Sequence, residues 1–302
     1  MRTALSTSTN ICAFAPEGKR NNIPWCVEAC ARAGYQVLDV NLCEGMNPDS
    51  LLCGDEWEGY VKKIARLGRD AGVVFTQTHL PYYDLFGPIE AGRKAWMEEL
   101  ITRSIIASGI LGVRWAVTHP GTVYEAKGDM AVSLKRNLDY FEPHVRLARQ
   151  VGIGIALEND FEYKAPPFQR IFCAEVGELC DLADAFSDPE HVGICYDFGH
   201  AHLTGGFHRE NLNRIGKRLK ATHVADNHGK ADEHLMPFYG TIDWAQAMAG
   251  LRDIAYTGEL TYEIQEFGRY LPNRLKPLVI QHSLVIGKEL QELYEKTEEL
   301  AL

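Results

Sequence analysis

Acidic and imidazole side chains end six short apolar runs of this chain, where they could bind a metal or transfer protons. They are His79 in VVFTQTH, His119 in WAVTH, Glu158 in IGIALE, Asp197 in VGICYD, His223 in LKATH and Glu263 in ELTYE. This mixture of oxygen and nitrogen ligands suits Mn²⁺, Mg²⁺ or Co²⁺, and Zn²⁺ as imidazoles are added. We predict a divalent-metal site with these ligands: Glu158, Asp197, His223 and Glu263.

Further candidates accompany these four residues. His200 lies in DFGHAHL, and Asp232 and His234 lie in KADEHLMPFYGTIDW. With His79 and His119, they are candidates for an additional metal or for contacts with a substrate. Any one of them alone would more often be an ordinary hydrogen-bonded group. Many ionisable groups in one place, however, repel and desolvate one another unless cations compensate.

The elements that must position these residues alternate between strand and helix. Strands are predicted at residues 3–8, 35–41, 72–79, 113–119, 152–158, 192–197, 221–225 and 259–263. Helices are predicted at residues 24–33, 56–71, 90–108, 131–150, 174–186, 209–219, 244–254 and 277–300, several of them ended by a glycine such as Gly34, Gly72, Gly109 or Gly152. Eight such units predict a (β/α)8 TIM barrel, in which all strands end at the face that carries the active site.

An open, doubly wound α/β sheet would share this alternation. It would place its site in one crevice between two strands and would leave most of the polar strand ends unexplained. The closed barrel accounts for all of them. About 250 residues suffice for such a barrel, so we expect residues 1–302 to form a single domain.

Composition and charge narrow the function classes. The net charge of −10 disfavours electrostatic binding of nucleic acid or of an anionic membrane over a broad surface. The chain has neither a run of about 20 apolar residues nor a signal peptide, so we expect a soluble, cytoplasmic protein. Its eight cysteines include no Cys-x-x-Cys pair, which indicates reduced core residues.

Around the candidate ligands the chain resembles the xylose isomerase-like barrels, which include sugar isomerases, ketose epimerases, inosose dehydratases and endonuclease IV. The resemblance covers nearly the whole chain and rests on the segments THLPYY, THPG, ALEND, GICYDFGHAH and ADEHLMPFYGTIDW. It implies that the ligand set of endonuclease IV is matched by His79, His119, Glu158, Asp197, His200, His223, Asp232, His234 and Glu263.

Several positions depart from particular members of that group. Phe198 and Gly199 stand where the nuclease typically has threonine and cysteine, and VADNHGK lacks the arginine that ketose epimerases usually carry after the residue matching His223. PFYG stands where many relatives have Pro-Gly-x-Gly, and we expect it to bring aromatic side chains to the pocket. Our candidates for substrate binding are Asn41, His200, Phe238 and Tyr239.

The function that the resemblance implies is a divalent-metal-dependent isomerase or epimerase of a sugar, sugar phosphate or polyol. Glu158 and Glu263 would transfer the proton through a metal-stabilised enediolate, with Mn²⁺, Mg²⁺ or Co²⁺ as the cofactor. Three alternative functions stay open. They are a zinc-dependent abasic-site phosphodiesterase similar to endonuclease IV, an inosose dehydratase-like lyase and a catalytically silent sugar binder. Zn²⁺ is expected if the site is multinuclear. A small sugar is the expected partner, nucleic acid is disfavoured, and a homo-oligomer stays open.

Overall fold

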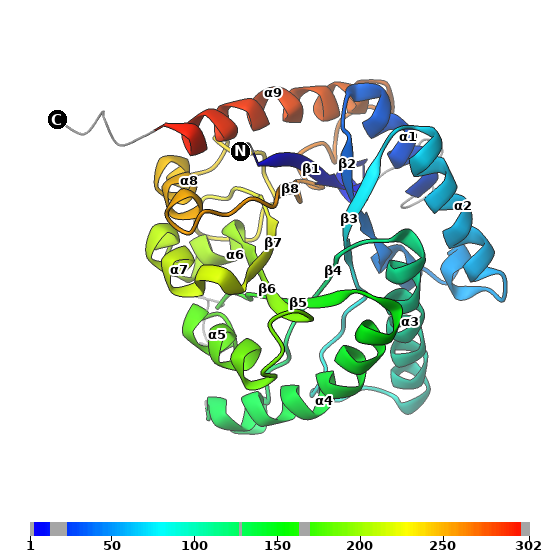
Figure 1. Ribbon diagram of the computed structural model, residues 1–302, viewed down its shortest axis with the longest axis vertical. Coiled ribbons are helices and arrows are strands. Elements are labelled where there is room, and N and C mark those ends of the chain that lie inside the picture. Colours follow the sequence, from blue (N-terminus) through cyan, green and yellow to red (C-terminus); the bar gives the residue numbers. More distant parts are fainter. Residues whose placement is uncertain (1–2, 13–22, 127–128, 163–169, 297–302) are drawn as a thin grey trace.

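The computed structural model describes residues 3–12, 23–126, 129–162 and 170–296. Within these ranges, eight parallel strands form one sheet in the order β7-β6-β5-β4-β3-β2-β1-β8. Figure 1 shows the strands at the centre of the molecule with the helices arranged around them. The predicted (β/α)8 barrel is confirmed.

The strands are short and lie close to their predicted positions. Their bounds are β1 Ala4–Ser8, β2 Val37–Asn41, β3 Val74–His79, β4 Trp115–Thr118, β5 Gly154–Glu158, β6 Val192–Asp197, β7 Leu219–His223 and β8 Glu259–Tyr262. Between β7 and β8, the Val224 amide donates to Thr261 O (2.7 Å) and Val224 O accepts from the Glu263 amide (3.1 Å). These two bonds nearly close the sheet into a barrel.

Helices connect successive strands. The α-helices are α1 Ile23–Ala33, α2 Trp57–Asp70, α3 Ala91–Leu111, α4 Met130–Val151, α5 Val176–Ala185, α6 Phe198–Thr204, α7 His208–Ile215, α8 Trp244–Asp253 and α9 Lys276–Glu295. Short 3-10 helices are η1 Thr9–Cys12, η3 Leu42–Met46, η4 Leu51–Cys53, η5 Tyr124–Ala126, η6 Gly216–Arg218 and η7 Asn273–Leu275. In the described part of the chain, no helix combines the length and apolar character that crossing a membrane requires.

The segment around β6 and β7 differs from the prediction. An unpredicted helix, α6, begins directly after β6, because the Asp197 side chain caps it by accepting a hydrogen bond from the His200 amide (2.7 Å). The strand predicted at 221–225 begins and ends two residues earlier, at Leu219–His223. The helix predicted at 209–219 correspondingly ends at Ile215.

Two helix ends also differ from the prediction. Helix α3 continues past Gly109, and its cap is Gly112, with a φ of +76°. Gly109 instead allows α3 to approach α4 closely, since a Cβ at Gly109 would lie 2.9 Å from Val151 Cβ. The last helix ends at Glu295, and residues 297–300 of its predicted range lie outside the described residues.

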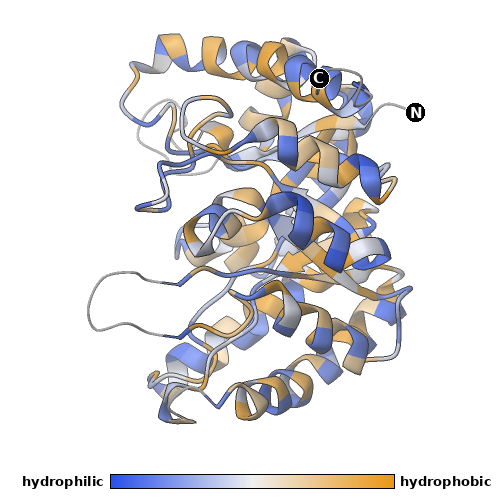
Figure 2. Ribbon diagram, turned by 90° about the vertical axis from the view of Figure 1, so that its left-hand side faces the viewer, coloured by the Kyte–Doolittle hydropathy of each residue, from blue (hydrophilic) through white to orange (hydrophobic). Residues whose placement is uncertain are grey.

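The inward faces of the strands form layers beneath the polar strand ends. Side chains two positions apart on a strand share a face, so the residues two positions before Glu158, Asp197 and His223 point into the barrel with them. They belong to a small apolar cluster: Trp115, Val117, Ala156, Cys195 and Ala221. Figure 2 shows that the central strands are largely hydrophobic. On β4 to β7, the polar strand ends therefore lie above apolar side chains.

Gly154 leaves room for the ring of Trp115 in this layer. A Cβ at Gly154 would lie 2.2 Å from Trp115 Cζ3. We expect Gly154→Ala to lower the free energy of unfolding by about 1–3 kcal/mol, because the ring or the strand must shift. Urea unfolding measures this change. Gly54→Ala is the control, since a Cβ at Gly54 would meet its nearest neighbour at 3.8 Å; equal losses in both variants would contradict the packing.

The cysteines of the described residues are free thiols. Five are buried, namely Cys26, Cys30, Cys173, Cys180 and Cys195, and Cys43 and Cys53 are partly buried. The expectation of reduced cysteines, mostly in the core, agrees with this distribution. The side chain of Cys12 lies outside the described residues.

Candidate metal centre

Four acidic and imidazole side chains meet at the carboxyl ends of β5 to β8. Glu158, Asp197 and His223 are the last residues of β5, β6 and β7, and Glu263 directly follows β8. Each residue offers one ligand atom, and these four atoms all lie within 4.8 Å of one another. All four residues are buried. We call these four residues the ligand cluster. They could together hold a metal ion.

His223 lies between the two glutamates of the ligand cluster. Its Nδ1 is 2.7 Å from Glu158 Oε1 and 3.5 Å from Glu263 Oε2. Among the described residues, Glu158 Oε2 and Asp197 Oδ2 are buried without a hydrogen-bond partner. A buried carboxylate oxygen without a hydrogen bond costs free energy, and a divalent cation could bind both oxygens. The donor set therefore fits a metal ion.

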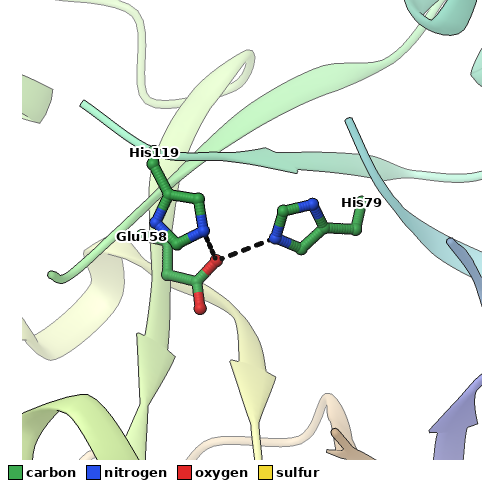
Figure 3. Close-up of side chains that lie close together, drawn as sticks. All are labelled: His79, His119 and Glu158. Carbon is green, nitrogen blue, oxygen red and sulfur yellow. Dashed lines mark ion pairs between the residues drawn. The ribbon is translucent and has the colours of Figure 1, made fainter. Parts of the chain in front are cut away.

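Two further imidazoles approach Glu158 from β3 and from the end of β4. His79 Nε2 lies 3.3 Å and His119 Nε2 lies 3.4 Å from the same oxygen, Glu158 Oε2. Figure 3 shows both rings directed at this oxygen. The three residues also offer ligand atoms within 4.8 Å of one another. The Glu158 carboxylate could therefore be shared between two cations.

His200, Asp232 and His234 form a second group beside the ligand cluster. Asp232 Oδ2 lies 2.8 Å from His234 Nε2 and 3.7 Å from His200 Nε2. The backbone of His234 has a φ of +44°, which is uncommon for a residue other than glycine. Its Nδ1 donates to Glu263 O (2.9 Å), which joins it to β8. The structure thus brings all the candidate ligands of the sequence analysis to one face.

Backbone carbonyls fix the tautomers of three of these imidazoles. Nδ1 donates to the carbonyl oxygen of the next residue in His79 (2.8 Å), of Asn159 in His200 (2.9 Å) and of Glu263 in His234 (2.9 Å). A carbonyl oxygen only accepts, so in each ring Nδ1 carries a proton. The Nε2 atoms of these rings face carboxylates. Each Nε2 could therefore bind a cation or carry a second ring proton that the carboxylate accepts.

The charges in and around the ligand cluster shift its pKa values. Burial alone would raise the pKa of Glu158, but the imidazoles of His223 and His119 outweigh it and hold that pKa well below its ordinary value. Burial raises the pKa of Asp197 to about 6. Burial also lowers the pKa of His119 to about 3, although Glu158 opposes that shift. The site thus holds an ionised glutamate beside a neutral imidazole near neutral pH.

A cavity of about 630 Å³ opens at this site. Candidate ligands and substrate contacts among its lining residues are Asn41, His79, His119, His200, Asp232, His234 and Glu263. Glu158, Asp197 and His223 of the ligand cluster are fully buried and are not among the described lining residues. The lining also includes residues that the sequence analysis missed: Cys43, Tyr82, Tyr83, Asp160, Phe161 and Gln265. They follow strand ends by a few residues, and a polar or aromatic side chain at such a position was the signal that could have identified them.

Two predicted substrate contacts lie elsewhere. Phe238 and Tyr239 are not among the described residues that line the cavity, and they are 47% and 48% exposed. Phe238 packs near Trp244, with ring centroids 6.4 Å apart. The Tyr239 hydroxyl pairs with Nε2 of His282 (3.0 Å). The role of these two aromatic side chains as substrate contacts stays a prediction.

The family of the chain follows from comparison with known proteins. The sequence profile described as xylose isomerase-like TIM barrel matches residues 27–283. The chain belongs to the xylose isomerase-like TIM-barrel family. The match spans β2 to β8 of this xylose isomerase-like barrel, and it includes every residue of the ligand cluster.

Curated relatives of this xylose isomerase-like barrel include two uncharacterised proteins. One, from Sinorhizobium fredii, is 40% identical over 244 residues, which are 77% of this chain and 68% of the relative. The other, from Methanocaldococcus jannaschii, is 28% identical over 259 residues, which are 83% of this chain and 80% of the relative. Neither relative carries a described activity.

Solved structures share the fold of this xylose isomerase-like barrel. A D-tagatose 3-epimerase-like protein has a TM-score of 0.71 and 22% identity, covering 97% of this chain and 98% of that one. The 3-keto-D-glucoside 4-epimerase of E. coli has a TM-score of 0.68 and 18% identity, covering 95% and 99%. At these identities the likeness establishes the fold alone.

Behind the pocket of this xylose isomerase-like barrel, Glu44 is buried in η3 and accepts a hydrogen bond from the Tyr60 hydroxyl (3.1 Å). Burial raises the pKa of Glu44 from 4.5 to about 7, although the bond from Tyr60 opposes the shift. Below pH 4.5 the carboxyl is neutral in both the folded and the unfolded chain, and its contribution to the free energy of unfolding is at its maximum. Between pH 4.5 and about 7 the folded state retains the proton that the unfolded state loses. The contribution of Glu44 therefore falls as the pH rises.

Glu44→Gln removes this titration but keeps an oxygen that accepts from Tyr60. We expect the variant to match the original protein near pH 4.5 and to exceed its free energy of unfolding at pH 8 by up to about 3 kcal/mol. Urea unfolding at the two pH values measures this difference. Parallel pH dependence in the two proteins would contradict the assignment.

Proposed function

We propose that this protein is a divalent-cation-dependent isomerase or epimerase of a sugar. The observation that carries the proposal is the ligand cluster. Two glutamates, an aspartate and a histidine are buried at the carboxyl ends of four successive strands, and two of their carboxylate oxygens have no hydrogen-bond partner among the described residues. Active sites of such barrels lie at this end. The same fold occurs in a D-tagatose 3-epimerase-like protein and a 3-keto-D-glucoside 4-epimerase, which supports a sugar as the substrate.

The proposed chemistry is proton transfer between the two glutamates and a substrate carbon. Glu158 has a pKa well below its ordinary value, so it is ionised near neutral pH and can remove the proton next to a sugar carbonyl. Glu263, on the other side of His223, can donate a proton to the same or the neighbouring carbon, and proton exchange with solvent then resets the two carboxyl groups for the next turnover. A divalent cation, when bound by the ligand cluster, would stabilise the negative charge that develops on the sugar oxygens.

We propose an uncharged sugar as the substrate class. The acidic side chains among the described lining residues are Asp84, Asp160, Asp232 and Glu263, and that lining contains no lysine or arginine. Arginine and lysine are the side chains that usually bind phosphate groups. Asn41 and His200 also line the cavity and can hydrogen-bond sugar hydroxyls. The lining therefore favours a free ketose or keto-polyol over its phosphate.

A paired substrate screen tests this proposal. Protein loaded with Mn²⁺ is incubated with free ketoses and keto-polyols and with the matching phosphates, and the products are separated by chromatography. We expect at least one free sugar to be converted to its isomer or epimer, and its phosphate to react far more slowly. Conversion of phosphates alone would contradict the substrate class, and no conversion of any sugar would contradict the proposal.

A second candidate function is phosphodiester hydrolysis by a multinuclear zinc site. The observation that favours it is the convergence of His79 and His119 on Glu158 Oε2 and of His200 and His234 on Asp232 Oδ2. The acidic cavity lining and the net charge of −10 count against a nucleic acid. Cleavage of an oligonucleotide with an abasic site by the Zn²⁺-loaded protein would support this candidate. Loss of water from a keto-polyol in the same screen would instead indicate an inosose dehydratase-like lyase.

A further inference from the structure

A buried carboxylate, Asp39, lies in the layer beneath the ligand cluster. It belongs to β2 and precedes Asn41 by two positions, so both side chains share the inward face. Asp39 Oδ2 accepts a hydrogen bond from Gln77 Nε2 (2.8 Å) and lies 3.8 Å from His223 Nε2. Among the described residues, Asp39 Oδ1 and His223 Nε2 are both buried without a hydrogen-bond partner. His223 Nε2 therefore faces the same Asp39 oxygen that accepts from Gln77, at the longer distance of 3.8 Å.

Hydrogen bonds across the barrel orient the Asp39 carboxylate. The hydroxyl of Thr261 on β8 donates to Gln77 Oε1 (3.4 Å), which turns the amide nitrogen of Gln77 toward Asp39. All three side chains are buried. A buried carboxylate is costly unless a positive group or a proton donor faces it. The basic side chain that Asp39 faces is His223.

His223 is oriented opposite to the other imidazoles of the site. In three of those rings a backbone carbonyl accepts from Nδ1, and Nε2 faces the carboxylates. In His223, Nδ1 faces Glu158 Oε1 at 2.7 Å, and Nε2 faces Asp39 Oδ2 at 3.8 Å. A neutral imidazole carries one ring proton. That proton lies either on Nδ1, beside Glu158, or on Nε2, beside Asp39.

We infer that Asp39 is a positioning residue that keeps the ring proton of His223 on Nε2 and so leaves Nδ1 available to a divalent cation. The inference rests on the proposed function, because it requires a cation at the ligand cluster. A proton on Nδ1 would occupy the ring atom that faces the cluster. The charge of Asp39 favours the other position, in the way that a carboxylate behind a metal-binding histidine fixes its tautomer.

Cation affinity of the full chain, measured apart from activity, tests the inference. Asp39→Asn keeps the shape of the side chain and removes its charge. We expect it to weaken Mn²⁺ binding in calorimetry by about 10–100-fold, with little change in the Tm of the cation-free protein. It should also shift the visible absorption bands of the Co²⁺-loaded protein, because the His223 ligand is altered. Tyr35→Phe is the control, since it removes a buried hydrogen bond to Ser283 and neither residue is among the described lining of the cavity; it should leave both readouts unchanged.

A second variant keeps the test decisive if Asp39→Asn does not fold. Gln77→Met removes the donor to Asp39 at similar length and should weaken Mn²⁺ binding in the same direction by a smaller factor. Mn²⁺ affinity within about twofold of the original in the folded variants, at the precision of such assays, would overturn the role of Asp39 while the proposed function stands. If the unaltered protein bound no Mn²⁺, the proposed cation site itself would fall, and this inference with it.

Discussion

Glu158→Gln and Glu263→Gln should each lower the turnover of the sugar substrate by about 10²–10⁴-fold or more. Each substitution removes a carboxylate that we propose to transfer the proton, and it leaves an isosteric amide in the same buried position. Glu158 should show the larger loss. Its carboxylate also lies within ion-pair distance of His79, His119 and His223. The substitution therefore also removes the negative charge that these three imidazoles share.

Glu266→Gln is the matched control for these two variants. Glu266 lies three residues beyond Glu263 and pairs with Arg269 at the surface (2.8 Å). The Glu266→Gln variant should retain full turnover, and circular dichroism should show the same fold in all three variants. Turnover near the original value in both Glu158→Gln and Glu263→Gln would contradict the proposed proton transfer.

Removal of divalent cations should abolish turnover and lower the Tm. Without a cation, the ligand cluster retains buried oxygens on Glu158 and Asp197 that have no hydrogen-bond partner among the described residues. A cation that binds only the folded chain stabilises it by about 2.7 kcal/mol when its free concentration is about 100 times Kd. Treatment with a chelator, followed by activity and thermal unfolding measurements, should show both losses.

Addition of Mn²⁺ after the chelator is removed should restore both quantities. The Asp197→Asn variant should need a higher Mn²⁺ concentration for the same recovery, because it lacks one carboxylate of the ligand cluster. Full turnover in protein that elemental analysis finds free of divalent metals would contradict the dependence on a cation.

The fold could be predicted from the sequence because two signals agree. Short apolar runs alternate with helical segments, and each of six runs ends in an acidic residue or a histidine. A barrel is the architecture that gathers such ends at one face, and the structure has this architecture. The same reasoning placed Glu158, Asp197 and His223 at strand ends, where the structure has them.

Residues whose role depends on contacts across the barrel could not be predicted in this way. Asp39 lies in the middle of the run VLDVN, and its meaning depends on Gln77 of β3 and His223 of β7, which are far away in the sequence. Helix α6 was missed because a single side chain, Asp197, caps it directly after a strand. Phe238 has a positive φ of 71°, a backbone conformation that the local motif PFYG does not reveal.

Deuterium incorporation from solvent tests the central claim most directly. The Mn²⁺-loaded protein is incubated in D₂O with the sugar that it converts, and the label in the product is located by nuclear magnetic resonance. Proton transfer through Glu158 and Glu263 predicts deuterium at the isomerised or epimerised carbon, and Glu158→Gln should remove this incorporation. Product that forms with no deuterium at that carbon and with equal rates in the two proteins would contradict the account.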